Sequence, residues 1–453
     1  MNPAILSAKL RVLCVFLFAL CVESPADGET STTTLPEGDI SAPYGVCAHL
    51  TWQEFPGRKK TFALCSVAGI GLVRCDFPWP DHERKRGEWT FTKTDTIVAD
   101  AKAVGVAILP ILDFWHGGYP RQFDDLEPWA RHVRRVAEHY AEDIPVFEIW
   151  NEQDGQRKDG LDNPTNYVAV LKAAFEAIRE KAPSARVAIG GHSGVPLAYI
   201  EKLYKLGAGA YFDIMNVHPY CIPDPPEGRL DSQLEKLRAL MAKYGDAEKP
   251  IWITEIGWPT SERKPGFDLK TDRTDYIGGV DEATSALYLS RALGIAFAEG
   301  VETFLPYELR DREHERYNRE SYFGLCRNDF TPKPAFAAYA AFTSMRPAGS
   351  AQKTDRPWRD GDFFFPQWRR PDTAGALRET DVRGPLGADA GMLWTTDKTL
   401  WKDGARRILR FTSDKMRFFN YLGAEVWPER RDDGWEVEVT DKPVFFVGGQ
   451  LKD

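Results

Sequence analysis

Eight short apolar runs, each followed by a stretch of helical periodicity, fill the chain from Tyr44 to about Met345. The runs are rich in β-branched residues and almost continuously apolar, as strands buried on both faces of a sheet must be. They begin at Tyr44, Gly71, Val106, Ile144, Arg186, Phe212, Pro250 and Val301, and the clearest helical patterns cover 94–105, 163–183 and 281–300. Eight strand–helix units over ~300 residues predict a parallel (β/α)8 barrel, an α/β fold of the TIM-barrel type, rather than a doubly wound sheet.

The chain changes character from about Pro347 onward. Gly, Pro and Asp punctuate short alternating runs there, and no helical pattern of convincing length remains. This pattern predicts a small β-sandwich-like domain at residues 347–453, following a barrel at residues 43–346. Since the segment carries no second set of site-like residues, we expect it to pack against the barrel rather than to act as a separate binding module.

The N-terminus is expected to lie outside the fold. Lys9 and Arg11 precede an apolar run, Val12–Val22, that is short for a bilayer span and typical of a secretory signal. We interpret residues 1–22 as a signal peptide and residues 23–42 as a flexible leader, which predicts a secreted or periplasmic protein. A membrane anchor is the alternative, and the missing stop-transfer flank disfavours it.

Charge and composition exclude several classes of partner. A formal net charge of −9 argues against nucleic acid or an anionic membrane surface, and no stable membrane insertion is expected. Five cysteines lie beyond the signal, widely spaced and without CxxC, which indicates buried free thiols rather than a disulfide framework. The eight histidines show no HxH or HExxH spacing, so neither a metal nor another cofactor is expected.

Two acids stand where strands of the predicted barrel end. Asn151–Glu152 closes the fourth run and Glu255 closes the seventh. Barrel enzymes carry their chemistry at these ends. Side chains alternate along a strand, so we expect Glu152 to share a face with Glu148 and Trp150, and Glu255 to share one with Ile251 and Ile253. If both faces look into the barrel, two carboxylates converge at its mouth.

A converging pair of carboxyl groups is what glycoside hydrolysis requires. One must be protonated to donate to the leaving oxygen, and the other must be ionised to attack the anomeric carbon. An amide such as that of Asn151 can bind a sugar hydroxyl beside the reacting carbon. The alternative is that one Glu is a solvated loop acid and the other a structural carboxylate, which is less easily reconciled with two acids at two strand ends.

These residues also carry a family resemblance. WNE at Trp150–Glu152 together with TEIGW at Thr254–Trp258 resembles the retaining glycoside hydrolases of clan A. The segments GLVRCDFPWPDHERKRGEWTFTKTD and ESYFGLCRNDFTPKPAFAAYAAF resemble glycoside hydrolase family 39 most, with family 5 as a neighbour, and the likeness spans nearly the whole chain. Gln153 stands where many members have Pro, a departure that leaves the chemistry intact.

The resemblance implies roles for individual residues. Glu152 would be the general acid/base and Glu255 the nucleophile of a glycosidase that acts on an oligo- or polysaccharide with retention of configuration. Asn151 would contact the 2-hydroxyl. His218 and Tyr220, in HPY, match the clan's pattern, in which the Tyr bonds the nucleophile. Arg74 would hold that carboxylate ionised.

Each supporting residue has a plainer interpretation. Arg74 could instead neutralise Glu148 inside the barrel, because a buried acid needs a partner. His218 could be a core histidine bonded to backbone. Aromatic faces at strand ends can stack on a sugar ring, so Trp115 and Trp258 are candidates, although packing is the default for Trp115. His49 and His116 also end strands and are candidates of second rank.

Two charged loops follow the seventh and eighth runs. A basic cluster there could bind a uronic acid. In the second loop, however, the arginines alternate with acids, which indicates a solvated, salt-bridged rim: Arg310, Arg312, Arg316 and Arg319. Whether the substrate is anionic or neutral is left open by the sequence.

Two rival functions are considered. GGHSGV places Ser193 after a strand as in a nucleophile elbow of a serine hydrolase, but Val195 stands where that elbow needs Gly. The other rival is a non-catalytic carbohydrate-binding barrel, which the presence of both acids disfavours.

Overall fold

A computed structural model describes most of the chain beyond its first 42 residues. The described residues are 43–51, 57–121, 123–268, 270–312, 316–354, 357–372, 387–398, 406–413, 415–432 and 434–452. The expected signal peptide and leader lie outside them. None of the helices in the described part of the chain combines the length and apolar character that a membrane crossing needs.

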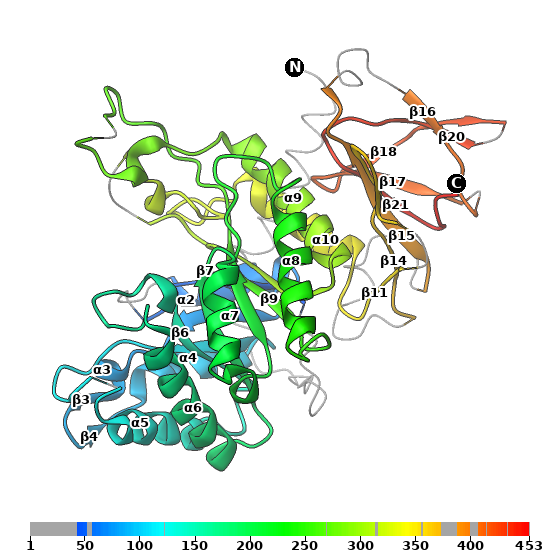
Figure 1. Cartoon of the computed structure of the whole chain (residues 1–453). Helices are drawn as coiled ribbons and strands as arrows, with labels where there is room; N and C mark the ends of the chain where they lie inside the picture. The colour runs from blue at the N-terminus through cyan, green and yellow to red at the C-terminus, as the bar shows by residue number, and fades with distance from the viewer. Residues whose placement is uncertain are drawn as a thin grey trace, which may run out of the picture.

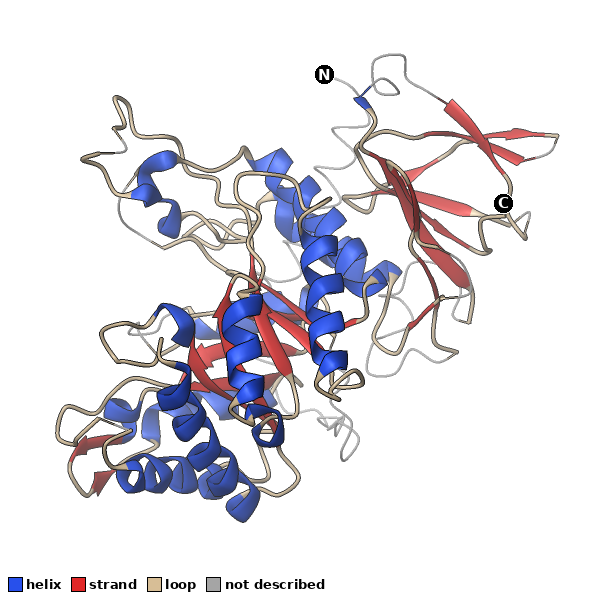
Figure 2. Ribbon diagram, viewed as in Figure 1, coloured by secondary structure: helices blue, strands red, loops and turns tan. Residues whose placement is uncertain are grey.

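Eight parallel strands form the predicted barrel (Figures 1 and 2). Their order in the sheet is their order in the chain, and a parallel bridge from Tyr44 to Phe304 joins the last strand to the first. The strands are β1 (Gly45–Cys47), β2 (Leu72–Asp76), β5 (Ala107–Leu112), β6 (Val146–Asn151), β7 (Arg186–Ser193), β8 (Met215–His218), β9 (Ile251–Ile256) and β10 (Val301–Pro306). The eight apolar runs of the sequence therefore correspond to the eight strands.

Helices cover the outside of the barrel. Several begin at side-chain caps: Asp125 accepts from the Glu127 amide, and Asn163 and Asp281 cap two of the three helices with the clearest sequence periodicity. The barrel helices are α2 (Arg58–Val67), α4 (Thr92–Lys102), α5 (Leu126–His139), α6 (Pro164–Lys181), α7 (Leu197–Lys205), α8 (Leu230–Lys243), α9 (Glu282–Ala298) and α10 (Pro334–Met345). A short helix α3 (Trp79–His82) and a hairpin of β3 (Glu83–Lys85) and β4 (Glu88–Trp89) extend the connection after β2.

The barrel interior is a filled layer of side chains. Each strand or its immediate flank contributes one member of a buried cluster: Cys47, Leu72, Leu109, Val146, Ala188, Ile214, Trp252 and Leu305. Two positions farther along three of these strands, toward their carboxyl ends, the inward-facing residues are polar: Arg74, Glu148 and Thr254. An apolar floor thus supports a polar layer at the mouth of the barrel.

The C-terminal residues form an antiparallel β domain, as predicted. Its larger sheet contains β11 (Ala351–Gln352), β12 (Arg359–Asp360), β13 (Phe363–Phe364), β14 (Gln367–Arg369), β15 (Asp389–Thr395), β17 (Arg417–Asn420), β18 (Glu425–Val426) and β21 (Val444–Val447), and its smaller one β16 (Arg406–Leu409), β19 (Glu429–Arg431) and β20 (Gly434–Glu438). Phe418 and Phe446 of the larger sheet share a buried cluster with Leu409 and Val437 of the smaller one. Two sheets packed through such a cluster make a sandwich-like domain.

The β domain packs against α9 and α10 of the barrel (Figure 1). The Glu227 side chain, in the loop between β8 and α8, is 7% exposed, and its carboxylate accepts a 2.8 Å hydrogen bond from the Trp394 indole of β15. Arg291 of α9 lies 2.9 Å from the same oxygen. Above Gly294 of α9 there is no room for a Cβ, because Met392 and Trp394 fill the space. The β domain therefore packs against the barrel, as expected.

Candidate active site

The end of β6 departs from regular strand geometry. Trp150 and Glu152 have φ angles of 73° and 47°, in the left-handed region that side chains rarely adopt. Trp150 consequently packs outward against Trp115 and Trp129. Asn151 turns inward instead, so the expectation that Glu148, Trp150 and Glu152 share one face is wrong. Strained backbone of this kind is characteristic of functional sites.

Strand β9 also loses its alternation before it ends. Ile251 and Ile253 belong to the cluster outside the barrel, whereas Trp252 lies in the interior layer. Between Ile253 and Ile256 the register with β10 shifts, because three steps along β9 match two along β10. The extra residue turns Glu255 toward the barrel mouth. Glu255 therefore points inward, although it does not share a face with Ile251 and Ile253 as expected.

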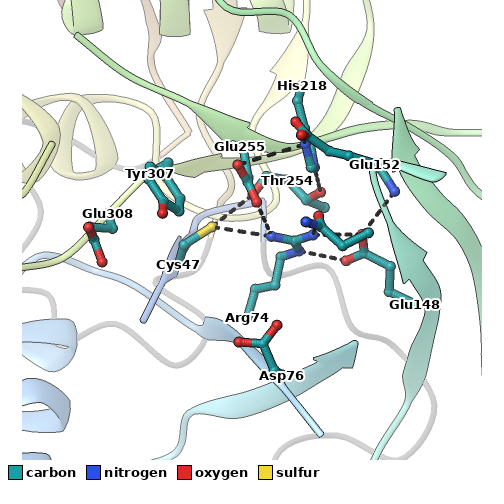
Figure 3. Close-up of polar contacts among 12 residues, drawn as sticks. Cys47, Arg74, Asp76, Glu148, Glu152, His218, Thr254, Glu255, Tyr307 and Glu308 are labelled. Carbon is teal, nitrogen blue, oxygen red and sulfur yellow. Dashed lines mark hydrogen bonds and ion pairs between the residues drawn. The ribbon is translucent and has the colours of Figure 1, made fainter. Parts of the chain in front are cut away.

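The two predicted acids converge at the mouth of the barrel (Figure 3). Single ligand atoms of Glu152, His218 and Glu255 all lie within 4.8 Å of one another. The Glu152 side chain is 31% exposed, whereas that of Glu255 is 11% exposed. The pair thus combines one partly solvated acid with one enclosed acid.

Glu255 is held in its ionised form. Its Oε1 lies 2.6 Å from Arg74 Nη1, and its Oε2 accepts a 2.9 Å hydrogen bond from the Tyr220 hydroxyl. Burial alone would raise the pKa of Glu255. The positive field of His218 and Arg74, with the hydrogen bonds from Arg74 and Tyr220, outweighs that effect and lowers this pKa to about 2.

Arg74 binds both of the acids that the sequence suggested as its partner, Glu148 and Glu255. Its Nε and Nη2 donate to Glu148 at 2.6 and 2.9 Å, while Nη1 binds Glu255. Nη2 also donates to Asn151 Oδ1 at 2.8 Å, which fixes the amide next to Glu152. The guanidinium is buried, and its fork geometry suits two carboxylates at once.

A chain of hydrogen bonds orients His218 beside Glu152. The Thr254 hydroxyl donates to Asn216 Oδ1 at 2.8 Å, so it accepts from His218 Nε2, 3.0 Å away. His218 Nδ1 then faces Glu152 Oε1 at 3.0 Å. Since Nε2 carries a proton, the contact between Nδ1 and Glu152 also requires one, and the pair shares it.

The first two glycines of GGHSGV allow close packing around β7, and Gly191 makes room for this histidine. A Cβ at Gly191 would lie 2.0 Å from His218 Nε2, and one at Gly190 would collide with the Trp150 carbonyl. Ser193 is exposed at the end of β7. The imidazole on the neighbouring strand, His218, directs its nitrogens to Glu152 and Thr254 instead. This arrangement favours close packing over a nucleophile elbow as the reason for the motif.

The three clustered ligand atoms could in principle hold a metal ion, although the sequence suggested none. The donor set is two carboxylates and an imidazole, which suits zinc. One of those carboxylates is already paired with the Arg74 guanidinium, whose charge opposes a second cation beside it. An acid–base pair fits these residues better than a metal centre.

A second group of polar side chains at the barrel mouth was not singled out from the sequence, apart from His49 and the loop residue Arg312. His49 Nδ1 lies 3.5 Å from Asp76, and its Nε2 lies 3.5 Å from Glu308 and 3.2 Å from the Tyr307 hydroxyl. Arg312 donates to Glu308 at 3.0 Å and to Tyr307. Asp76 closes β2 and Tyr307 directly follows β10. Their places at strand ends were the signal that could have found them.

Another buried acid stands behind this group. Asp113, just after β5, shares a side-chain hydrogen bond with Asp76. Burial first, and then the charge of Asp76, raises the pKa of Asp113 well above its usual range. The raised pKa favours the neutral form of the Asp113 carboxyl, hydrogen-bonded to Asp76.

Three aromatic or imidazole candidates are placed elsewhere. Trp258 is 2% exposed and its indole donates to the Asp224 carbonyl, so it offers no ring face to a sugar, contrary to expectation. His116 is buried, accepts from the Gly118 amide, and packs on Trp79. Trp115 is half-buried against Trp79 and Trp150. The remaining candidates, Arg74, Asn151, His218 and Tyr220, all contact one of the two acids or the arginine between them.

Comparison with known proteins was informative for structure alone. No family model matches the sequence, and no curated protein matches it. A family 39 glycoside hydrolase from Bacteroides cellulosilyticus WH2 superposes with a TM-score of 0.72 at 19% identity, over 91% of this chain and 83% of that one. A family 39 β-xylosidase from Caulobacter crescentus gives 0.60 at 13% identity, over 91% and 97%.

A family 30 endoxylanase from Clostridium papyrosolvens C71 gives a TM-score of 0.59 at 10% identity, over 90% of this chain and 96% of the other. The chain thus has the fold of the glycoside hydrolases of families 39 and 30, with both the barrel and the β domain included. The resemblance to clan A expected from WNE and TEIGW, and to family 39 from the segments that begin at Gly71 and Glu320, is confirmed at the level of the fold.

Proposed function

We propose that the protein is a retaining glycosidase in which Glu152 is the general acid/base and Glu255 the nucleophile. In the first step a Glu255 oxygen attacks the anomeric carbon while the glycosidic bond breaks. Glu152 gives its proton to the departing oxygen, which leaves as an alcohol. In the second step Glu152 takes a proton from water, whose oxygen bonds the anomeric carbon, and Glu255 departs as a carboxylate.

The observation that carries this proposal is the unequal environment of two acids at short separation. Glu255 is enclosed and held ionised by Arg74 and Tyr220, whereas Glu152 is partly exposed and faces His218 Nδ1 at 3.0 Å. One carboxyl oxygen of each acid lies within 4.8 Å of one on the other, which favours the retaining separation of roughly 5–5.5 Å over the wider one that lets an inverting enzyme hold a water beside its base. Asn151, fixed by Arg74, is positioned to donate its amide to the 2-hydroxyl.

The proposal extends to the substrate and to export. Families 39 and 30 as named above include a β-xylosidase and an endoxylanase, so a role in degrading oligo- or polysaccharides is in keeping with the fold. The charged and apolar pattern of residues 1–22 supports secretion into the medium or periplasm. N-terminal sequencing of the exported protein tests the second point, since the mature chain is expected to begin after that segment.

Replacement of each acid tests the mechanism. Glu255→Ala is expected to abolish turnover, and azide is expected to restore a product of inverted anomeric configuration, because the anion enters where the carboxylate stood. Glu152→Ala should spare the first step for aryl glycosides with good leaving groups and slow it for poor ones. Glu262→Ala, which removes an exposed acid on the same face, is the matched control and should remain active. Full activity of Glu255→Ala would refute the assignment.

A further inference from the structure

Different side chains lie on the two sides of Glu255: Glu152 on one, and Tyr307 and Glu308 on the other (Figure 3). Glu152 must meet the glycosidic oxygen, so the leaving group lies on its side of the site. The remaining carbons of the attacked sugar extend away from that oxygen. In Figure 3, Tyr307 and Glu308 lie in this direction, on the side of Glu255 opposite Glu152. The group of His49, Asp76, Tyr307, Glu308 and Arg312, here called the distal group, therefore faces the far end of the sugar.

The distal group is largely enclosed, opens through His49 and Arg312, and is rich in acceptors. The side chains of His49 and Arg312 are 17% and 24% exposed, whereas those of Asp76 and Glu308 are 8% and 4% exposed. Asp76 and Glu308 contribute carboxylate oxygens on either side of the His49 ring. Carboxylates accept hydrogen bonds from hydroxyl groups and repel other carboxylates.

The one arginine of the distal group already has its counter-ion. Arg312 Nε lies 3.0 Å from Glu308 Oε1, and its Nη2 contacts His49 Nε2 at 2.6 Å. A carboxylate on the substrate would have to displace Glu308 from this guanidinium. It would then leave the Glu308 charge buried beside that of Asp76 without its partner, which is costly.

Most basic side chains of the two loops that follow β9 and β10 are already paired with acids. In the described part of these loops each contacts an acid, an aromatic ring or a carbonyl, or is exposed, and the undescribed residues 269 and 313–315 include no Lys or Arg. The contacts are Arg263 over Phe267, Lys264 with Asp272, Arg273 with Asp275, Arg310 over Phe330, Arg316 with Glu262, Arg319 with Glu320, Arg327 with Glu282 and Lys333 with Asp311, and Lys270 is exposed.

We propose that the distal group selects a neutral, polyhydroxylated sugar and excludes a uronic acid at the position attacked by Glu255. The inference rests on the proposed glycosidase function. Sugar hydroxyls donate to Asp76 and Glu308, while Tyr307 and Arg312 donate to sugar oxygens. Glu308 acts as the specificity residue, because its charge both accepts a hydroxyl and occupies Arg312.

Matched aryl glycosides test the charge preference. Wild-type protein is assayed at pH 7 against 4-methylumbelliferyl glycosides of neutral pentoses and hexoses and of glucuronic and iduronic acid, in both anomers, and against neutral and uronic polysaccharides. We expect kcat/KM for the best neutral substrate to exceed that for any uronide at least 100-fold. Preference for a uronide overturns this inference while leaving the Glu152–Glu255 mechanism intact. Cleavage of no substrate at all overturns both.

A variant at Glu308 tests the residue assigned. Glu308→Gln is expected to lower kcat/KM at least 10-fold for the neutral substrate and to narrow the neutral-to-uronide ratio, because Arg312 is released. Glu262→Gln, whose side chain is 68% exposed, is the matched control and should change neither. If Glu308→Gln does not fold, His49→Gln replaces it, with the same loss expected on the neutral substrate. Unchanged neutral turnover in the folded variant refutes the role of the distal group.

Discussion

Arg74 Nη1 lies 2.6 Å from Glu255 Oε1, deep in the barrel mouth. This contact makes the free energy of unfolding depend on pH. The pKa of Glu255 is lowered from 4.5 to about 2, so its ionised form stabilises the folded state above pH ~4.5 and loses that effect as pH falls toward ~2. The full contribution is about 3 kcal/mol, of which about 2 kcal/mol is lost by pH ~3.

Urea unfolding of the wild type and of Glu255→Gln between pH 5.5 and pH 3 measures this dependence. The variant has no carboxyl group to titrate, so the difference in unfolding free energy between the two proteins should shrink as the pH falls. A difference that stays constant over this range would show that Arg74 does not depress the acidity of Glu255 in the folded state.

Tyr220→Phe isolates the second partner of the nucleophile. The hydroxyl fixes Glu255 Oε2 at 2.9 Å and, with Arg74, sets the plane of the carboxylate. Its loss removes one hydrogen bond to a charged group, worth roughly 1.5–3 kcal/mol, so we expect kcat/KM to fall about 10- to 100-fold. Circular dichroism should be unchanged because the ring is retained. Activity equal to the wild type would mean that Arg74 alone positions the nucleophile.

Thr254→Val tests the proton shared by His218 and Glu152. Without the hydroxyl, Nε2 of His218 loses its acceptor, and the imidazole no longer has to present Nδ1 as the acceptor for Glu152. General-acid help is typically worth 10²–10⁴-fold, so partial loss should slow aryl glycosides with poor leaving groups by about 10-fold and spare those with good ones. An equal loss on every leaving group would point to a merely structural role.

Gly191→Ala tests the close approach of β7 to the same ring. The new methyl group would lie 2.0 Å from His218 Nε2, and the ring would have to move away from Glu152. We expect a loss of at least 10-fold in kcat, with destabilisation of about 1–3 kcal/mol from overpacking. Gly155→Ala, where a Cβ meets nothing within 4 Å, is the control. Wild-type kinetics of Gly191→Ala would show that the ring position is not critical.

Much of the fold followed from the sequence because the barrel repeats one pattern. Eight apolar runs with helices between them predict a single architecture, and the acids at the ends of β6 and β9 were found by position alone. The alternation argument that brought Glu152 and Glu255 together failed in its details. Two residues with left-handed backbone at the end of β6 and an extra residue in β9 reorient these side chains. Neither feature can be detected from the periodicity of the sequence.

The contacts of the distal group and of Trp258 could not be predicted from the positions of the strands. Glu308 and Arg312 belong to a loop, and their meeting with His49 and Asp76 depends on how that loop folds back across the barrel mouth. Trp258 follows β9 closely enough to suggest a sugar platform, yet the loop carrying Asp224 covers it. Loop conformation is set by tertiary contacts that composition does not specify.

The buried contact between Glu227 and Trp394 has a practical consequence for anyone shortening this protein. A barrel cut after residue 346 would lose the indole that shares Glu227 with Arg291 and would expose the loop between β8 and α8 at that point. The same loop carries Tyr220, the hydrogen-bond partner of Glu255, so we expect removal of the sandwich to disturb the nucleophile. Trimmed or domain-swapped versions should keep both halves together as one cooperative body.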